Sequence, residues 1–267
     1  MRTGSDSIAL GRDAPVRRDL VLSAAIILLL GLTLGQLGFF DAPRLSRGLR
    51  NLVLFSRDNI PPDLGIVPLG ISALLETIQM AFAGTLLGFI MALPLGVLGT
   101  ATLFPLPIVL PTRLLVAVVR TVPSLLWGVL FVIIVGLGPL AGTLALAFYT
   151  LGYLAKLFAE FFEGTDPEVV EAVRGLGASK AQLARFVLWP ESANAVLSQL
   201  LFLMEYNVRA SAILGFVGAG GIGFYMQVYL QTLEYRRLAT LLLLILGMVV
   251  LMDLSSAWVR RRYLATM

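Results

Sequence analysis

Six long apolar runs dominate this chain and limit what it can fold into. They lie at about residues 21–39, 69–98, 114–135, 140–162, 193–214 and 238–259. Each run supplies about the 20 residues that an α-helix needs to cross the hydrocarbon core of a bilayer. Charged residues make up only 13% of the chain, against about a quarter in soluble domains. The runs predict an all-α polytopic membrane protein with six transmembrane helices.

The runs join into one expected transmembrane domain over residues 21–262, preceded by a polar cytoplasmic tail at residues 1–20. The first run can also be read as a secretory signal, but it is long for one and no small-x-small cleavage site follows. We therefore expect a retained first helix. Arginines at both ends and in residues 163–190 favour cytoplasmic termini, although arginines on the other side weaken this bias.

The residue types that are missing exclude several kinds of chemistry. The chain has no Cys and no His, which excludes thiol chemistry, disulfides and the common zinc sites. No Gly-x-x-x-x-Gly-Lys-Ser/Thr string is present, so ATP is not expected to bind here. The net charge of +4 comes with arginines beside apolar runs, which is typical of contact with lipid headgroups rather than nucleic acid. We expect neither an enzyme nor a cofactor or metal in this chain.

Residues 163–190 form the longest polar segment after the first loop, and they predict two short helices. Asp166 is a natural N-cap with Pro167 at the first helical position. Gly177 helps to break that helix. Ser179 and Gln182 make a capping box that starts the second helix.

The same segment carries apolar positions at helical spacing. Val169, Val170, Ala172 and Val173 are expected to form an apolar stripe on the first helix, and Leu183, Phe186 and Val187 are expected to share one face of the second. Pro190 is expected to end the second helix before the fifth apolar run.

This segment resembles the EAA loop of permeases from bacterial ABC importers. Glu171 and Ala172, then Gly177, and finally Pro190 are in register with that loop, while Val173, Val187 and Trp189 replace its usual residues. The resemblance implies a type I ABC-importer permease fold with a cytoplasmic helix–turn–helix that docks on a separate ATPase. The residues implied for ATPase coupling are Glu171, Ala172, Gly177, Ala178, Leu183, Phe186 and Pro190.

Further strings resemble the phosphonate importer permease family. They are Arg-Thr-Val-Pro at 120–123, Gly-Leu-Gly-Pro at 136–139, Lys-Leu-Phe-Ala-Glu at 156–160, Asn-Val-Arg-Ala at 207–210 and the glycine-rich segment 215–223. This resemblance implies a permease of the bacterial inner membrane that moves a phosphonate, phosphite or hypophosphite. The partners it implies are an ABC ATPase dimer that binds ATP and Mg²⁺, a second permease copy or sister chain, a substrate-binding protein outside, and membrane lipid.

Several charges fall inside the apolar runs, where each costs about 2.5–3.5 kcal/mol on insertion scales. Glu205 and Arg209 are four residues apart and can pair on one helix face. Arg209, together with Arg120, either lends positive potential to an anion path or serves structure, by balancing Glu205 and by reaching the membrane surface. Lys156 and Glu160 are expected to form a salt bridge near a helix end.

The segment 215–223 holds five glycines in nine residues and predicts a break in the helix. Its free N–H groups can form a gate or hold an oxyanion. Close packing of helices on small residues is the alternative. The residues expected to line the path or gate are Arg209, Glu205, Asn207, Arg120, Ser124, Gly218, Gly220, Gly221 and Gly223.

Two other functions remain open from the sequence. A methionine or amino-acid importer permease shares the same general pattern. An ion-coupled secondary transporter would use Glu205 or Glu160 to carry protons, and the resemblance of residues 163–190 to a coupling loop argues against it.

Overall fold

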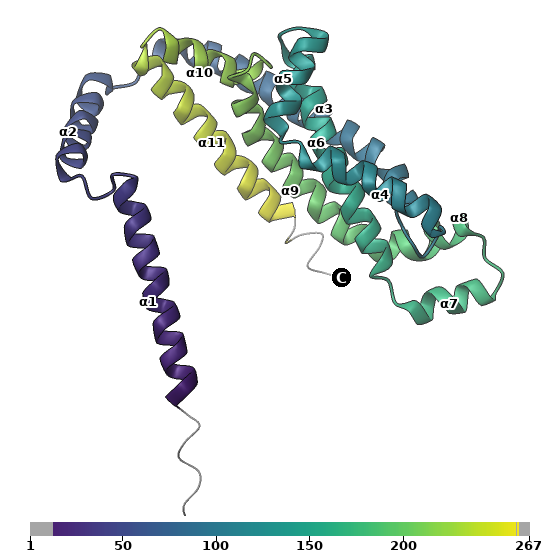
Figure 1. Ribbon diagram of the computed structural model, residues 1–267. Helices are drawn as coiled ribbons and strands as arrows, with labels where there is room; N and C mark the ends of the chain where they lie inside the picture. The colour runs from purple at the N-terminus through teal and green to yellow at the C-terminus, as the bar shows by residue number, and fades with distance from the viewer. Residues whose placement is uncertain (1–12, 260, 262–267) are drawn as a thin grey trace, which may run out of the picture. The chain divides into compact units, whose positions relative to one another are not determined.

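The structure is a computed structural model that describes residues 13–259 and residue 261, and the residues described are helical or lie in short connections (Figure 1). The helices are α1 (Asp13–Gln36), α2 (Ala42–Asn59), η1 (Leu64–Ile66), α3 (Val67–Leu98), α4 (Leu106–Thr121), α5 (Ser124–Val135), α6 (Pro139–Glu163), α7 (Pro167–Gly175), α8 (Lys180–Leu183), η2 (Ala184–Leu188), α9 (Trp189–Gly215), α10 (Gly221–Gln231) and α11 (Tyr235–Val259). Most of the expected tail, residues 1–12, lies outside the described residues, as do residues 260 and 262. Residues 13–20 already belong to α1.

The chain divides into two compact units at residue 60. The first contains α1 and α2, and the second, from Pro61 onward, contains the remaining helices. Within the first unit the 18-residue window Asp19–Gln36 is strongly apolar and has none of its residues buried. Such a helix is suited to lipid on every side.

Small residues hold the centre of the second unit together, where α3 packs along α6. Gly84, Gly88 and Gly96 of α3 are buried against α6. A Cβ atom at Gly88 would lie only 2.6 Å from the carbonyl oxygen of Ala147. Close approach on small residues is how membrane helices gain dispersion contacts without a hydrophobic driving force. The buried side of α6, which includes Phe158 and other residues, is the core of this unit.

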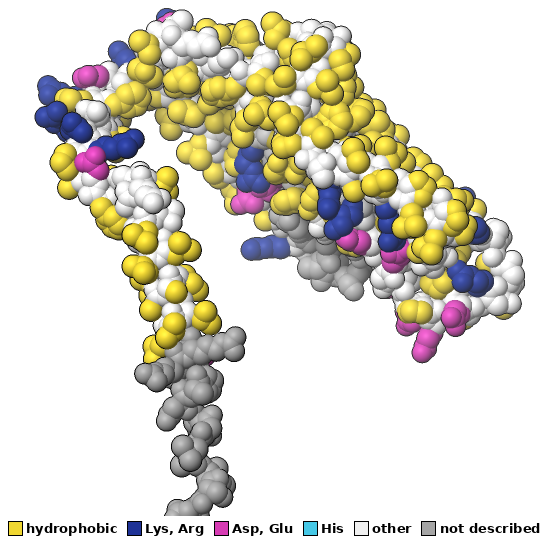
Figure 2. All heavy atoms as spheres, viewed as in Figure 1, with side chains coloured by type: hydrophobic (Ala, Val, Ile, Leu, Met, Phe, Trp, Pro, Cys, Tyr) yellow, Lys and Arg dark blue, Asp and Glu magenta, His cyan; other side chains and the backbone are white. Residues whose placement is uncertain are grey.

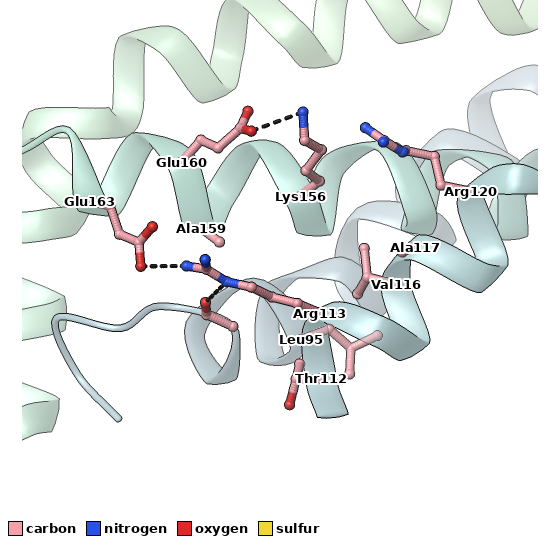
Figure 3. A pocket seen from close by; sticks show the side chains of 11 residues that line it. Leu95, Thr112, Arg113, Val116, Ala117, Arg120, Lys156, Ala159, Glu160 and Glu163 are labelled. Carbon is pink, nitrogen blue, oxygen red and sulfur yellow. Dashed lines mark hydrogen bonds and ion pairs between the residues drawn. The ribbon is translucent and has the colours of Figure 1, made fainter. Parts of the chain in front are cut away.

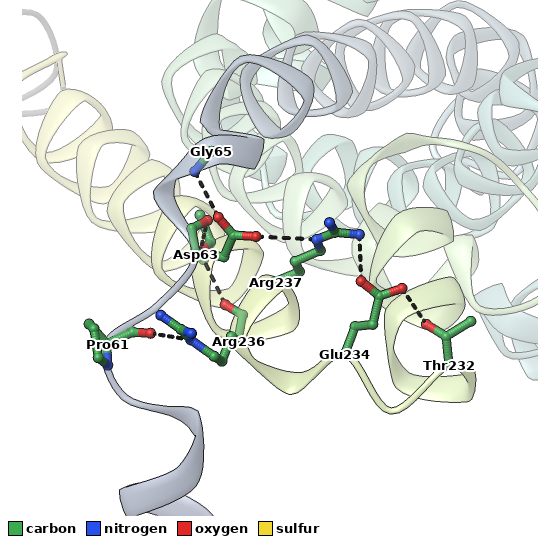
Figure 4. A network of polar contacts seen from close by, with 8 residues as sticks. Pro61, Asp63, Gly65, Thr232, Glu234, Arg236 and Arg237 are labelled. Atoms are coloured by element: carbon green, nitrogen blue, oxygen red, sulfur yellow. Dashed lines mark hydrogen bonds and ion pairs between the residues drawn. The ribbon is translucent and has the colours of Figure 1, made fainter.

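A polar network joins the chain before α3 to the start of α11 (Figure 4). Arg236 donates to the carbonyl oxygen of Pro61 at 2.8 Å, and Arg237 donates to Asp63 at 3.2 Å. The backbone N–H of Gly65 also donates to Asp63 and, with Arg237, holds the pKa of that carboxyl below its ordinary value. These contacts fix where α3 and α11 begin.

Among the described residues, five helical segments are long and apolar enough to cross a membrane, and a bent pair can make a sixth span. The surface of the second unit is accordingly covered by hydrophobic side chains, while charged side chains gather at the end that carries α7 and α8 (Figure 2).

The expected third span, residues 114–135, is not one straight helix. α4 ends at Thr121, α5 begins at Ser124, and the two axes differ by 88°. Pro123 has no N–H to continue the helix and disfavours helical geometry at Val122, which is extended with φ −82° and ψ 117°.

Pro190 does not end the helix that starts at Lys180, contrary to expectation. The chain continues through the π-helical turn η2 into α9, so that residues Lys180–Gly215 form one apolar segment. Pro190 lies in the first turn of α9, directly after the π-helical turn η2. The wider π turn accommodates proline, which has no backbone N–H to donate to the preceding turn. The short helix α8 is therefore the beginning of the fifth expected span.

Candidate functional site

The two short helices of residues 163–190 begin where the sequence predicts. The Asp166 carboxylate accepts from the N–H of Glu168 at 2.9 Å at the start of α7. Ser179 and Gln182 form the reciprocal capping box of α8. Local side-chain capping therefore sets both helix starts.

The apolar residues of these helices divide between an inner and an outer side. Val170, Leu183 and Leu188 are buried in a cluster with Phe158 and Phe162 of α6. Phe186, by contrast, is 67% exposed, and Val169 and Ala172 are exposed as well. Each apolar face is therefore covered only in part, because the core contacts are made by Val170 and Val173 in α7 and by Leu183, Val187 and Leu188 in α8 and η2.

The outer side carries most of the residues expected for ATPase coupling and an exposed leucine that sequence reasoning missed. Leu176 is 87% exposed at the turn between α7 and α8. Its place between two helix-breaking glycines marks it as the tip of the turn. Glu171, Ala172 and Gly177 are also exposed, as is Pro190. Ala178 is partly exposed, and Leu183 belongs to the internal packing.

Gly177 is required by backbone geometry rather than by lack of space. Its φ is +81°, and a Cβ atom placed on it would meet nothing within 4 Å. Left-handed geometry costs a non-glycine residue about 1–2 kcal/mol. Any side chain at this position therefore strains the turn that presents Leu176.

Side chains tie the two short helices to the turn between α3 and α4. Arg174 of α7 donates to the carbonyl oxygen of Thr102 at 2.7 Å. Lys180 of α8 lies 4.9 Å from the centre of the Phe104 ring. Glu163, at the end of α6, accepts from the N–H of Ala101 at 2.6 Å. Residues of α6, α7 and α8 thus all contact the short turn at residues 101–104, which leads into α4.

A cavity of about 310 Å³ opens beside this turn, between α3, α4 and α6 (Figure 3). Arg113 of α4 pairs with Glu163 and also donates to the carbonyl oxygen of Gly99 at 2.8 Å. Lys156 pairs with Glu160 at 2.8 Å, as the sequence predicts. Arg120 lines the same cavity and makes no ion pair with any described residue.

Arg120 owes its position to a glycine on the neighbouring helix. A Cβ atom at Gly152 of α6 would lie 3.1 Å from the backbone nitrogen of Arg120. The indole N–H of Trp127, in α5, donates to the carbonyl oxygen of Val119, in α4, at 3.3 Å and so bridges the break between these helices. The last turn of α4 is therefore pressed against α6, with the Arg120 side chain in the cavity.

Arg209 and Glu205 form the expected ion pair on α9, with 3.0 Å between guanidinium and carboxylate. The side chain of Glu205 is only 11% exposed, whereas that of Arg209 is 46% exposed. Arg209 lines a second cavity of about 120 Å³ together with Ser124 and Tyr206. The pair and the open cavity coexist, so that the two interpretations of Arg209 do not exclude each other.

Asn207 lies inside the helix bundle and does not face a cavity. Its side chain is fully buried and donates to the hydroxyl oxygens of Thr85 at 2.8 Å and Thr150 at 2.9 Å. It therefore links α3, α6 and α9, a role that sequence reasoning did not separate from lining the path.

The glycine-rich break lies between α9 and α10, as predicted, but most of its N–H groups are already bonded. Those of residues 216–219 donate to backbone carbonyl oxygens, and those of residues 221 and 222 donate to side chains of α3. The Glu76 carboxylate accepts from Gly221 at 2.8 Å, and the Thr77 hydroxyl accepts from Ile222 at 2.9 Å. Gly218, Gly220 and Gly221 all have positive φ. The expectation of free N–H groups is thus wrong at residues 216–219, 221 and 222, and at Gly221 the carboxylate of Glu76 occupies the place expected for an oxyanion.

Gly223 serves close packing, which is the alternative interpretation of this segment. A Cβ atom there would collide with the backbone of Ala212, and one at Gly215 would collide with the backbone at Gly223. α9 and α10 therefore meet backbone to backbone below the break.

Known proteins resemble this chain along most of its length. The phosphite transport system permease protein PtxC of Stutzerimonas stutzeri is 35% identical over 227 residues, which cover 85% of this chain and 82% of that protein. The phosphate-import permease protein PhnE of Mycolicibacterium smegmatis is 35% identical over 205 residues, 76% of this chain and 38% of that protein.

The fold also has relatives among solved structures. A structure of the MetNI methionine ABC transporter in an inward-facing conformation superposes with a TM-score of 0.66. It is 24% identical, and the match covers 74% of this chain and 98% of that one. Residues 84–264 match the family described as "Binding-protein-dependent transport system inner membrane component". This chain therefore belongs to that family of multi-pass inner-membrane permeases and has the type I ABC-importer permease fold.

Proposed function

We propose that this chain is the permease subunit of an ATP-driven importer that moves a small phosphorus oxyanion, such as phosphite or a phosphonate, across the bacterial inner membrane. The observation that carries the substrate class is the likeness to a phosphite permease over most of both chains. ATP and Mg²⁺ bind to a partner ATPase. The part of this chain is to form the path and to receive the movement of that ATPase.

The arrangement of basic side chains suits an anionic substrate. A phosphorus oxyanion carries one or two negative charges, so its passage needs compensating positive potential. Arg209 and Ser124 line one cavity, and Arg120, four residues before Ser124, lines the other. We assign Arg209, Ser124 and Arg120 to the path. Arg120 and Ser124 lie on either side of the break between α4 and α5, and Arg209 lies on α9.

The remaining path candidates support these three residues from within the protein. Glu205 holds Arg209 by its ion pair, and Asn207 ties α9 to its neighbours. Gly218, Gly220, Gly221 and Gly223 shape the turn that closes this end of α9. Their contribution is to fix the helices around the path rather than to touch the substrate.

Coupling follows from the exposed and buried sides of α7 and α8. The exposed side, with Leu176 at its tip and Phe186, is a surface for the groove of an ATPase. The contact between Arg174 and Thr102 carries the displacement of α7 to the turn before α4. Because Arg120 lies at the far end of α4, rocking of this helix changes how Arg120 faces the path.

The rival ion-coupled mechanism needs a carboxylate that is free to take up a proton. Glu160 and Glu205 are both ion-paired, at 2.8 and 3.0 Å. Each carboxylate is thus engaged by a basic side chain four residues away, which argues against a free proton carrier at either position.

The full transporter contains two ATPase subunits, a second permease that is either an identical copy or a sister chain, and a substrate-binding protein outside. The substrate class can be tested with this assembled complex. The complex, with its own binding protein, is given phosphite, methylphosphonate, phosphate or methionine, and its ATPase rate is measured. A phosphorus oxyanion raises the rate and methionine leaves it unchanged. Stimulation by methionine alone would refute the proposed substrate.

A further inference from the structure

The helix α2 has an apolar face that no other part of its unit covers. Leu45, Leu49, Leu52 and Val53 recur at helical spacing and therefore lie on one side of the helix. Their exposed fractions run from 51% to 67%, and no residue of α2 is buried. This face is too apolar to be left in water without a partner.

The opposite face of α2 is basic. At 3.6 residues per turn, Arg44, Arg47 and Arg50 point away from the apolar residues. Residues 41–59 contain four arginines and two aspartates, and basic side chains gather visibly over α2 (Figure 2). An apolar face opposite a basic one is typical of a helix that lies in the plane of a membrane surface.

The connections of α2 hold it near a bilayer. Residues 37–41 separate it from the apolar helix α1, and residues 60–63 separate it from the apolar segment Leu64–Leu98. An extended chain spans at most about 3.6 Å per residue. Each end of α2 therefore stays within about 20 Å of the place where a spanning helix leaves the membrane, and the helix is itself about 27 Å long at 1.5 Å per residue.

We infer that α2 binds acidic phospholipids in the plane of the membrane surface. Leu45, Leu49, Leu52 and Val53 enter the boundary of the acyl chains, and the arginines bind headgroup phosphates. Basic side chains close to an anionic membrane surface are attracted to it. An acidic protein surface would satisfy the arginines but leave the apolar face in water, whereas a lipid surface accommodates both faces.

The absence of Cys from the chain permits a direct test in the full-length protein. Single variants Leu49→Cys and Leu52→Cys report on the apolar face, with Arg47→Cys and Arg50→Cys, each two residues earlier and so on the opposite, basic face, as matched controls. Each is labelled with an environment-sensitive fluorophore and placed in vesicles of phosphatidylcholine with phosphatidylglycerol. Leu176→Cys, which is far from α2 in the chain and highly exposed, gives the aqueous reference.

The apolar-face probes should emit at shorter wavelength than the reference and be quenched by nitroxide-labelled lipid but poorly by acrylamide. The basic-face probes should emit at longer wavelength, be quenched well by acrylamide and be quenched poorly by nitroxide-labelled lipid. Omission of phosphatidylglycerol should raise acrylamide quenching of the apolar-face probes. Equal acrylamide quenching on both faces would overturn the inference. Protection that appears only after a binding protein is added would assign the face to a protein, and equal protection in pure phosphatidylcholine would refute the role of acidic headgroups.

Discussion

At the scale of single residues, Arg209 combines an ion pair with access to a cavity. Glu205 is almost enclosed, while the guanidinium of Arg209 extends from the pair toward Ser124. The enclosed carboxylate offsets part of the cost of placing an arginine at membrane depth. The exposed part of the guanidinium is then available to a passing anion, with N–H donors that match two oxygens at once.

Arg209→Gln should lower oxyanion uptake by roughly ten- to a hundredfold, because hydrogen bonds to charged groups contribute about 1.5–3 kcal/mol. Arg209→Lys should recover only part of the activity, because an ammonium lacks the paired donors. Uptake by the assembled transporter in vesicles is the measurement.

The double variant Glu205→Gln with Arg209→Gln is the control for structure. Removal of both partners of a buried pair is commonly far milder for stability than removal of one. We expect the double variant to assemble normally and to remain inactive. Recovery of uptake would show that Arg209 only balances Glu205.

Asn207 provides a contrasting case, in which a polar residue serves stability. Asn207→Leu leaves the hydroxyls of Thr85 and Thr150 without their shared donor. Loss of such buried partners costs about 1–3 kcal/mol. The thermal unfolding temperature of the purified protein should fall, whereas the conservative change Arg44→Lys on the exposed helix α2 should leave it unchanged. An unaltered unfolding temperature in Asn207→Leu would contradict this role.

At the scale of elements, α7 and α8 are joined to the membrane helices by one hydrogen bond, one cation–π contact and a line of buried apolar residues. The apolar contacts fix the position of the pair against α6. The polar contacts from Arg174 and Lys180 reach a different target, the turn that leads into α4. The pair can therefore act on α4 separately from its attachment to α6.

Arg174→Gln should uncouple the transporter, because Thr102 loses its link to α7 while the apolar contacts remain. We expect the ATPase to bind normally and hydrolyse ATP, with uptake per ATP hydrolysed strongly reduced. Arg185→Gln, on the neighbouring turn η2, is the matched control and should retain coupling. The same coupling ratio in both variants would exclude the route through Thr102.

The sequence predicts these elements well where a local signal sets them. Asp166 and Ser179 mark helix starts by capping, which depends only on near neighbours. The sequence did not reveal that Pro123 bends the third span or that Pro190 is absorbed by a π turn, because helix packing decides between a kink, a break and a bulge. Nor did it reveal that Glu76 closes the glycine segment, since that contact joins residues 145 positions apart.

At the scale of the whole molecule, the topology follows from the coupling surface and from the even number of crossings. If α7 and α8 meet a cytoplasmic ATPase, six spans place both termini on the same side as that ATPase. The positive-inside bias alone is a weak guide, because arginines of α2 lie on the other side in this arrangement.

Single cysteines and an impermeant thiol reagent on intact cells test this topology. Asp58→Cys and Leu137→Cys should be labelled from outside, whereas Ile108→Cys and Leu176→Cys should be labelled only after the cells are opened. Outside labelling of Leu176→Cys would invert the topology and remove the coupling surface from the ATPase.

Energised uptake tests whether ATP hydrolysis by a partner drives a phosphorus oxyanion through this permease. The full complex is reconstituted in vesicles with ATP inside and its binding protein with radiolabelled phosphite outside. Uptake should require ATP, survive collapse of the proton gradient and be lost in Arg209→Gln. Uptake that proceeds without ATP and stops when the proton gradient is collapsed would refute ATP-driven import.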